Sequence, residues 1–180
     1  PISVIAPEYH FNDSKEAVSY TVEVKAKDAA GNLSAPVSFR FRTPDTSAPT
    51  RPGTPVASAI AGTSATISWP ESTDNVAVTG YTVSINNTPA ITVAAPQHTF
   101  IDLQGGASYS IEVKAKDAAE NFSAPVSFDF LTPDTTAPTQ PGKLIISNIT
   151  RTSAKVTWPS STDNVAVTGY EVFLKPGTKT

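Results

Sequence analysis

The sequence has no cysteine and no methionine among its 180 residues. The absence of cysteine excludes disulfide bonds, thiolate metal ligands and cysteine nucleophiles, and it leaves the cellular compartment open. No apolar run approaches the roughly 18 residues of a membrane-spanning helix, which argues against membrane insertion. The net charge is −3 and the lysines and arginines are scattered singly. No basic surface for nucleic acid is therefore expected.

The chain repeats itself with an offset of 89 residues (Tyr109 minus Tyr20, and equally Trp158 minus Trp69). The copies align without a gap, which predicts a tandem array, and a repeat this long is a whole domain. The predicted domains are the C-terminal half of a module at 1–44, a complete module at 45–133, and the N-terminal half of a further module at 134–180.

Both ends of the sequence fall at the same phase of the repeat, inside a module rather than in a linker. A half-module exposes unpaired sheet edges and half a core. We therefore expect the segment to be one unit of a longer continuous array or fibre. Its half-modules would be completed by copies of the chain or by adjacent repeats.

The stretch 109–128 alternates apolar and polar residues with the period of a strand. Tyr109, Ile111 and Val113 alternate with polar residues, and the alternation resumes at Val126 after a loop rich in Asp and Asn. This pattern predicts an antiparallel strand pair with one buried face. Across 54–132 we expect seven short strands separated by turns, and no part of the chain shows helical periodicity.

The half-modules are expected to follow the same scheme. Short strands at 2–5 and 9–11 would precede another strand pair, and 143–180 would supply the first three strands of a further module. Proline-rich linkers at 43–53 and 132–142 favour extended and fairly stiff connections.

The order of Trp69, Tyr81 and the stretches 103–109 and 113–117 resembles a fibronectin type III domain. The resemblance implies an all-β fold of tandem immunoglobulin-like, seven-stranded β-sandwiches, with the Trp and Tyr packing the core. It also implies a corner motif, in which the hydroxyl of Tyr109 bonds back to the backbone near Leu103. Because the first copy has Ser14 in place of this leucine, its corner is expected to be looser.

The stretches 72–81 (STDNVAVTGY) and 134–138 (DTTAP) are similar to the bacterial extracellular branch of that family. Members of this branch occur in tandem beside secreted polysaccharide-degrading enzymes and in surface proteins. The resemblance implies a non-catalytic structural module of an extracellular or cell-surface bacterial protein, as part of a repetitive fibre or stalk. The alternatives are a spacer in a secreted polysaccharide-degrading enzyme and an adhesin whose loops bind a glycan or another surface ligand.

In the resembled fold, two loops lie at the pole where the incoming linker enters. This placement would gather acidic and amide side chains there, namely Asp45, Glu71, Asp74, Asn75, Asp117, Glu120 and Asn121. Oxygen ligands suit a hard cation. One interpretation is a calcium ion held by Asp45, Asp74, Asn75, Asp117 and Asn121, and no other cofactor is expected. The other interpretation is that these residues cap turns and solvate the junction.

Motifs of catalysis are lacking. The sequence has no Gly-rich phosphate loop and no Ser–His–Asp order, and His10 and His98 occupy different repeat positions. Asp74 and Asp117 resemble a carboxylate pair for acid–base chemistry, but both lie in loops that recur with the repeat. An active site is rarely copied into every spacer, so we expect a protein that is not an enzyme.

Overall fold

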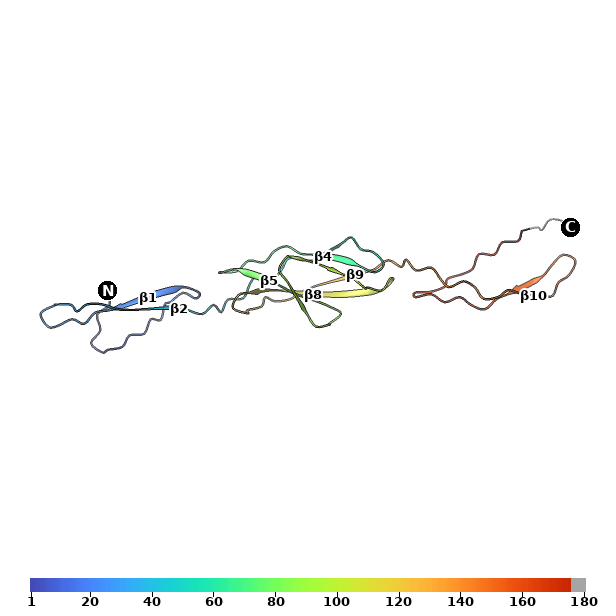
Figure 1. Cartoon of the computed structure of the whole chain (residues 1–180). Helices are drawn as coiled ribbons and strands as arrows, with labels where there is room; N and C mark the ends of the chain where they lie inside the picture. Colours follow the sequence, from blue (N-terminus) through green and yellow to red (C-terminus); the bar gives the residue numbers. More distant parts are fainter. Residues whose placement is uncertain (176–180) are drawn as a thin grey trace. The chain divides into compact units, whose positions relative to one another are not determined.

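The computed structural model describes residues 1–175, and β-strands are the regular elements throughout this range (Figure 1). Contacts divide the chain into two compact units. The first consists of Pro1–Pro55, Trp69–Pro96 and Ile111–Ser127, and the second consists of Val56–Ser68, Gln97–Ser110 and the described residues from Phe128 onward. Residues 1–175 contain no helix that is long and apolar enough to span a membrane.

The complete module forms two sheets. One sheet has the strand order β3-β4-β7, with the bounds Val56–Ser58, Ala65–Ser68 and Gln97–Phe100. The other has the order β6-β5-β8-β9, with the bounds Ile91–Val93, Val78–Ile85, Ser108–Asp117 and Val126–Leu131. These are the seven strands predicted from the alternation of apolar and polar residues, and the all-β sandwich fold is confirmed.

The core of the complete module follows the predicted alternation. In β8, Ile111 and Val113 are fully buried, while the intervening Glu112 is only half-buried. The rings of Trp69 and Tyr81, both buried, meet edge-on with centroids 5.4 Å apart. Such aromatic pairs stabilise a core beyond the area that they bury.

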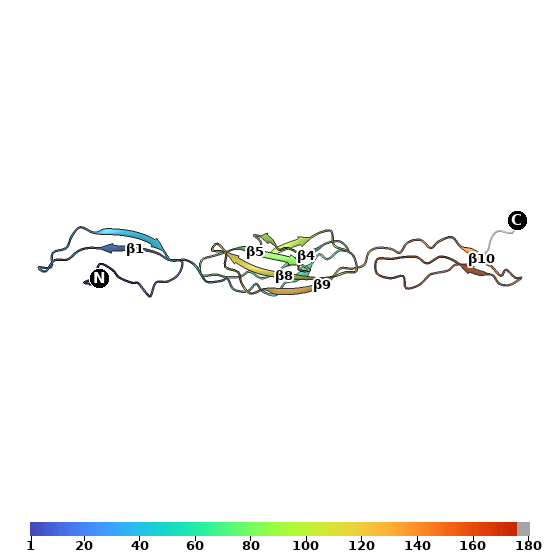
Figure 2. The same ribbon diagram turned by 90° about the horizontal axis from the view of Figure 1, so that it is seen from below.

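The first half-module contains one strand pair, formed by β1 (Ser19–Val24) and β2 (Val37–Arg42). Figure 2 shows these two strands side by side as arrows that run in opposite directions. Tyr20 lies opposite Phe41, and Val22 lies opposite Phe39. The predicted strand pair is therefore confirmed in this copy as well.

Tyrosine corners close both copies of this pair. The Tyr109 hydroxyl accepts a hydrogen bond from the Gln104 N–H at 2.7 Å, and the Tyr20 hydroxyl accepts one from the Lys15 N–H at 2.8 Å. The looser corner expected from Ser14 is not seen, because the bond that defines the corner has nearly the same length in both copies.

The strands predicted at 2–5 and 9–11 are wrong, since the structure has no strand there. Their counterparts in the complete module are β6, which pairs with β5, and β7, which pairs with β4. Residues 1–44 contain no counterpart of β4 or β5. Without a neighbouring strand to bond, these segments cannot form a ladder.

The second half-module forms two of its three predicted strands. Strands β10 (Ile145–Ser147) and β11 (Lys155–Thr157) pair in antiparallel fashion. The third strand, expected near Tyr170 as the counterpart of β5, is not formed. In the complete module β5 bonds β6 and β8, and the described residues from 134 to 175 contain no counterpart of either strand. The prediction for 176–180 lies outside the described residues.

Candidate cation site in the first linker and its loops

The first linker, 43–53, is bonded to the loop that precedes β5. The Thr50 N–H donates to the Thr73 carbonyl at 2.8 Å, and the Thr73 N–H donates to the Thr50 hydroxyl oxygen at 2.8 Å. Gly53 donates to the Pro70 carbonyl at 3.2 Å, and a Cβ on Gly53 would lie 2.6 Å from the Pro70 ring. The linker is thus held along a defined path. The same bonds recur one repeat later between Thr139 and Thr162 and between Gly142 and Pro159.

Asp74 lies in the loop that this linker contacts. Its Oδ2 accepts hydrogen bonds from the N–H groups of Val76 at 3.0 Å and Ala77 at 3.2 Å, which caps the turn into β5. Its Oδ1 is buried, with less than 1 Å² accessible, and has no hydrogen-bond partner. The Oδ1 of Asp163, the repeat counterpart, is buried and unpaired in the same way. The unpaired oxygen is therefore a property of this loop in both copies.

Asp117 ends β8 and is fully buried. Its Oδ1 accepts the N–H groups of Ala119 at 2.9 Å and Asn121 at 2.8 Å, and its Oδ2 accepts the Asn121 side-chain amide at 2.7 Å. Burial by itself would raise the pKa of Asp117, but the hydrogen bonds from Asn121 and Ala119 outweigh it and hold this pKa below its ordinary value. The carboxylate is therefore ionised at neutral pH.

Asp45 supplies a third carboxylate from the linker itself. Its Oδ1 accepts the Ser47 N–H at 3.3 Å and the Asn75 side-chain amide at 3.2 Å. One oxygen from each of Asp45, Asp74 and Asp117 lies within 4.8 Å of the other two. The fold thus gathers three carboxylates from three separate segments of the chain.

The two predicted amide ligands lie at this place but act as donors. Asn75 donates to Asp45, as described above, and the side-chain amide of Asn121 donates to the carbonyls of Asp45 at 3.4 Å and Ser47 at 3.2 Å. Both amides therefore tie the loops to the linker. Of the acidic residues expected nearby, Glu71 is exposed and Glu120 pairs with Lys116 at 2.6 Å.

Glu16 was not predicted to lie at this site, yet this residue of the first half-module binds the linker through hydrogen bonds. Its carboxylate accepts the Thr46 N–H at 3.2 Å, the Thr46 hydroxyl at 2.7 Å and the Ser47 hydroxyl. These bonds, that of Ser47 first, lower the pKa of Glu16. Its repeat counterpart is Gly105. Comparing the copies would have marked position 16 as unusual without saying what it contacts.

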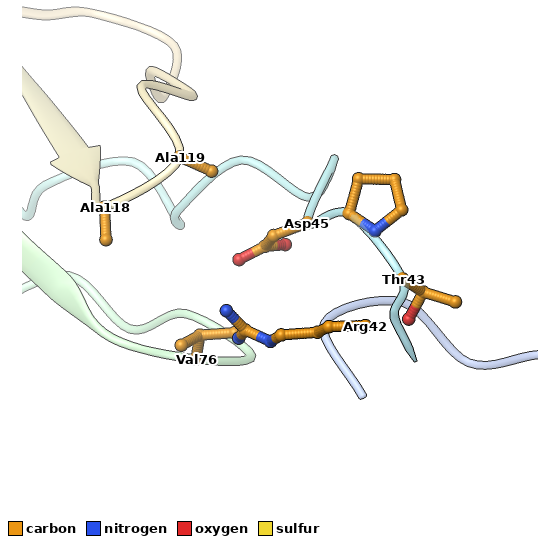
Figure 3. Close-up of a pocket in the computed structure, with 7 residues that line it drawn as sticks. Arg42, Thr43, Asp45, Val76, Ala118 and Ala119 are labelled. Carbon is orange, nitrogen blue, oxygen red and sulfur yellow. The ribbon is translucent and has the colours of Figure 1, made fainter. Parts of the chain in front are cut away.

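Arg42 is a second residue that was not predicted to lie at this site. It lines a cavity of about 380 Å³ together with Thr43, Pro44, Asp45, Val76, Ala118 and Ala119. Figure 3 shows its guanidinium group extending between Asp45 and Val76. Its Nε also donates to the Ala17 carbonyl at 3.2 Å. One positive charge thus lines the same cavity as Asp45, and the repeat counterpart of Arg42 is the uncharged Leu131.

Comparison with known families decides the fold family. Residues 47–129 match the family described as fibronectin type III domain. Residues 47–129 belong to the fibronectin type III family. A solved structure of the rat CD45 extracellular region, domains d3–d4, supports the fold alone. It is similar at a TM-score of 0.50 and 12% identity, covering 73% of each chain.

Curated relatives of this fibronectin type III chain are bacterial. Endoglucanase B of Cellulomonas fimi is 41% identical over 188 aligned positions, which cover 96% of this chain and 18% of the relative. Chitinase A1 of Niallia circulans is 41% identical over 135 positions, which cover 72% of this chain and 19% of the relative. The chain therefore spans about a fifth of the length of the relatives that it matches.

The carboxylate oxygens determine what chemistry this fibronectin type III site can perform. The carboxylates of Asp74 and Asp117 cap turns, as the simpler interpretation of the sequence held. Asp117 has no solvent access, so it positions its loop and does not face a dissolved substrate. The gathered ligand atoms are all carboxylate oxygens, which suit a hard cation.

Proposed function

We propose that this fibronectin type III chain is a non-catalytic spacer within a secreted bacterial enzyme that degrades a polysaccharide. The supporting observation is that relatives named endoglucanase and chitinase share this region at the same 41% identity. A region shared equally by enzymes named for different polymers does not select the polymer. Its share of 18% and 19% of those relatives leaves most of each chain for other domains.

The spacer explains the same features as a fibre or stalk, and the relatives favour the spacer. Polymers such as cellulose and chitin are too large to enter a cell, so an enzyme that attacks them works outside it. The exposed strand faces of the half-modules, such as Phe39 at 71% exposure, would be covered by adjacent repeats of the same polypeptide. A glycan or surface ligand on the loops is the remaining alternative.

The test uses the parent enzyme with residues 45–133 deleted. We expect unchanged hydrolysis of a short soluble oligosaccharide and slower release of sugar from the insoluble polymer, because the spacer sets only the reach between domains. The isolated chain should hydrolyse neither cellulose nor chitin, and it should not sediment with either of these polymers. Loss of activity on the short substrate, a glycosidase activity of the chain alone, or a parent without a catalytic domain would overturn the proposal.

A further inference from the structure

We infer that the carboxylates of Asp45, Asp74 and Asp117 bind one calcium ion, which clamps the linker to the loops that precede β5 and follow β8. The three residues come from separate segments, and their ligand atoms lie within 4.8 Å of one another. Mutual repulsion of three carboxylates makes this approach unfavourable unless a positive charge compensates it. Arg42 supplies one such charge near Asp45, and three carboxylates against one guanidinium leave a net negative charge for a cation to neutralise.

The buried Oδ1 of Asp74 is a second sign of a missing ligand, and Asp163 holds an oxygen of the same kind at a place where only the third carboxylate is lacking among residues 1–175. A carboxylate oxygen out of contact with water is costly unless it is paired or coordinates a metal. The other oxygen of Asp74 already accepts two backbone N–H groups, so the loop holds Oδ1 in place. A cation at this point would satisfy the one atom that the turn leaves unpaired.

The spacing of the oxygens allows a calcium ion, and their chemistry favours it. Oxygen ligands lie 2.3–2.6 Å from calcium, so ligands on opposite sides of the ion are about 4.6–5.2 Å apart. Oxygens within 4.8 Å of one another can therefore surround one calcium ion. Magnesium demands a near-ideal octahedron and gives up its water reluctantly, so it suits a set of carboxylates from separate segments less well than calcium does. With three carboxylates and water completing the shell, a dissociation constant of about 10⁻⁴–10⁻³ M is expected, as in extracellular modules.

Calorimetric titration of the full 180-residue chain with calcium chloride, in potassium chloride buffer, tests this inference. We expect one site per chain and a calcium-dependent rise of the melting temperature. Asp74→Asn removes the charge but keeps an oxygen for the Val76 and Ala77 amides, so the turn should persist while affinity falls at least tenfold. Asp163→Asn is the matched control, because no third carboxylate accompanies it among residues 1–175, and it should leave the titration unchanged.

A second variant is expected to gain calcium affinity, so that a loss of binding through misfolding cannot account for the results. Arg42→Leu copies the residue at the repeat counterpart, Leu131, and removes the positive charge near Asp45. It should bind calcium several-fold more tightly, which an unfolded chain cannot imitate. No heat and no melting shift at 10 mM calcium would overturn the inference, as would an Asp74→Asn variant that binds as the unaltered chain does.

Discussion

The complete module and the first half-module share local geometry but not burial. The rings of Tyr109 and Phe130 stack with centroids 5.5 Å apart, and those of their counterparts Tyr20 and Phe41 stack at 5.7 Å. Yet Val126 is 5% exposed and its counterpart Val37 is 74% exposed. Nearly identical sequences thus build the same strand pair in both places, and burial depends on a second sheet.

The loops that follow β8 and β1 also share their local geometry but differ in burial. The Asn121 backbone N–H and side-chain amide donate to the Asp117 carboxylate at 2.8 and 2.7 Å, and the same two groups of Asn32 donate to Asp28, both at 2.8 Å. Asp117 is nevertheless fully buried, while Asp28 is exposed. A side chain can therefore keep its local partners and contribute differently to stability, because burial multiplies the cost of losing them.

The largest expected difference in stability comes from replacing the tryptophan of the complete module and that of the second half-module. Trp69→Ala should destabilise the complete module by about 3–5 kcal/mol, since a large buried aromatic leaves a cavity. Trp158 keeps the same edge-on contact with Tyr170 at 5.4 Å but is not buried. Trp158→Ala should change the main unfolding transition by less than about 0.5 kcal/mol. Calorimetry of the full chain measures both, and equal effects would contradict the comparison.

A smaller change tests the same comparison between the two copies of the strand pair. Val113 is fully buried in β8, while its counterpart Val24 in β1 is 62% exposed. Val113→Ala should cost roughly 2–3 kcal/mol through lost burial and a small cavity, and Val24→Ala should cost less than about 0.5 kcal/mol. Denaturant unfolding followed by circular dichroism gives both values. A large effect of Val24→Ala would mean that β1 is covered in solution.

The same difference explains which features the sequence could predict. Alternation along 109–117 identifies the inward residues, and Tyr109 with Leu103 indicates the corner, because these patterns are local. The strands expected at 2–5 and 9–11 failed because alternation assigns a face but not a partner strand. The repeat comparison could place Asp45, Asp74 and Asp117 near one another, but not the unpaired oxygen of Asp74, which depends on how the turn orients its carboxylate.

Contacts between segments that are distant in the sequence could not be predicted from sequence patterns. Glu16 bonds Thr46 and Ser47 across 30 and 31 positions of the chain, and Arg42 lines the cavity beside Asp45. Neither position has a similar residue in the other copy. Such contacts depend on the path of the linker in space. A single sequence does not reveal that path, because no repeating pattern of residues marks it.

The smallest expected effect is a difference in acid sensitivity between the two loops. Asp117 has a pKa below its ordinary value of about 3.9 because Asn121 and Ala119 donate to its ionised form, against the opposing effect of burial. A lowered pKa in the folded state contributes stability above the unfolded pKa. That contribution is lost as the pH falls below about 4 and through the folded value. The melting temperature of the complete module should therefore fall between pH 5 and pH 2.5.

Asparagine variants separate the two loops in that experiment. In chelator-containing buffer, Asp117→Asn should lower the melting temperature at pH 7 and reduce its further fall on acidification, since the titrating group is gone. Asp28 also has a lowered pKa, caused first by the Asn32 side chain, but it lies exposed in the first half-module. Asp28→Asn should therefore leave the transition of the complete module unchanged at both pH values. If the Asp28 and Asp117 variants respond alike, burial does not distinguish the loops, and the contrast between complete and half-modules would fail at this position.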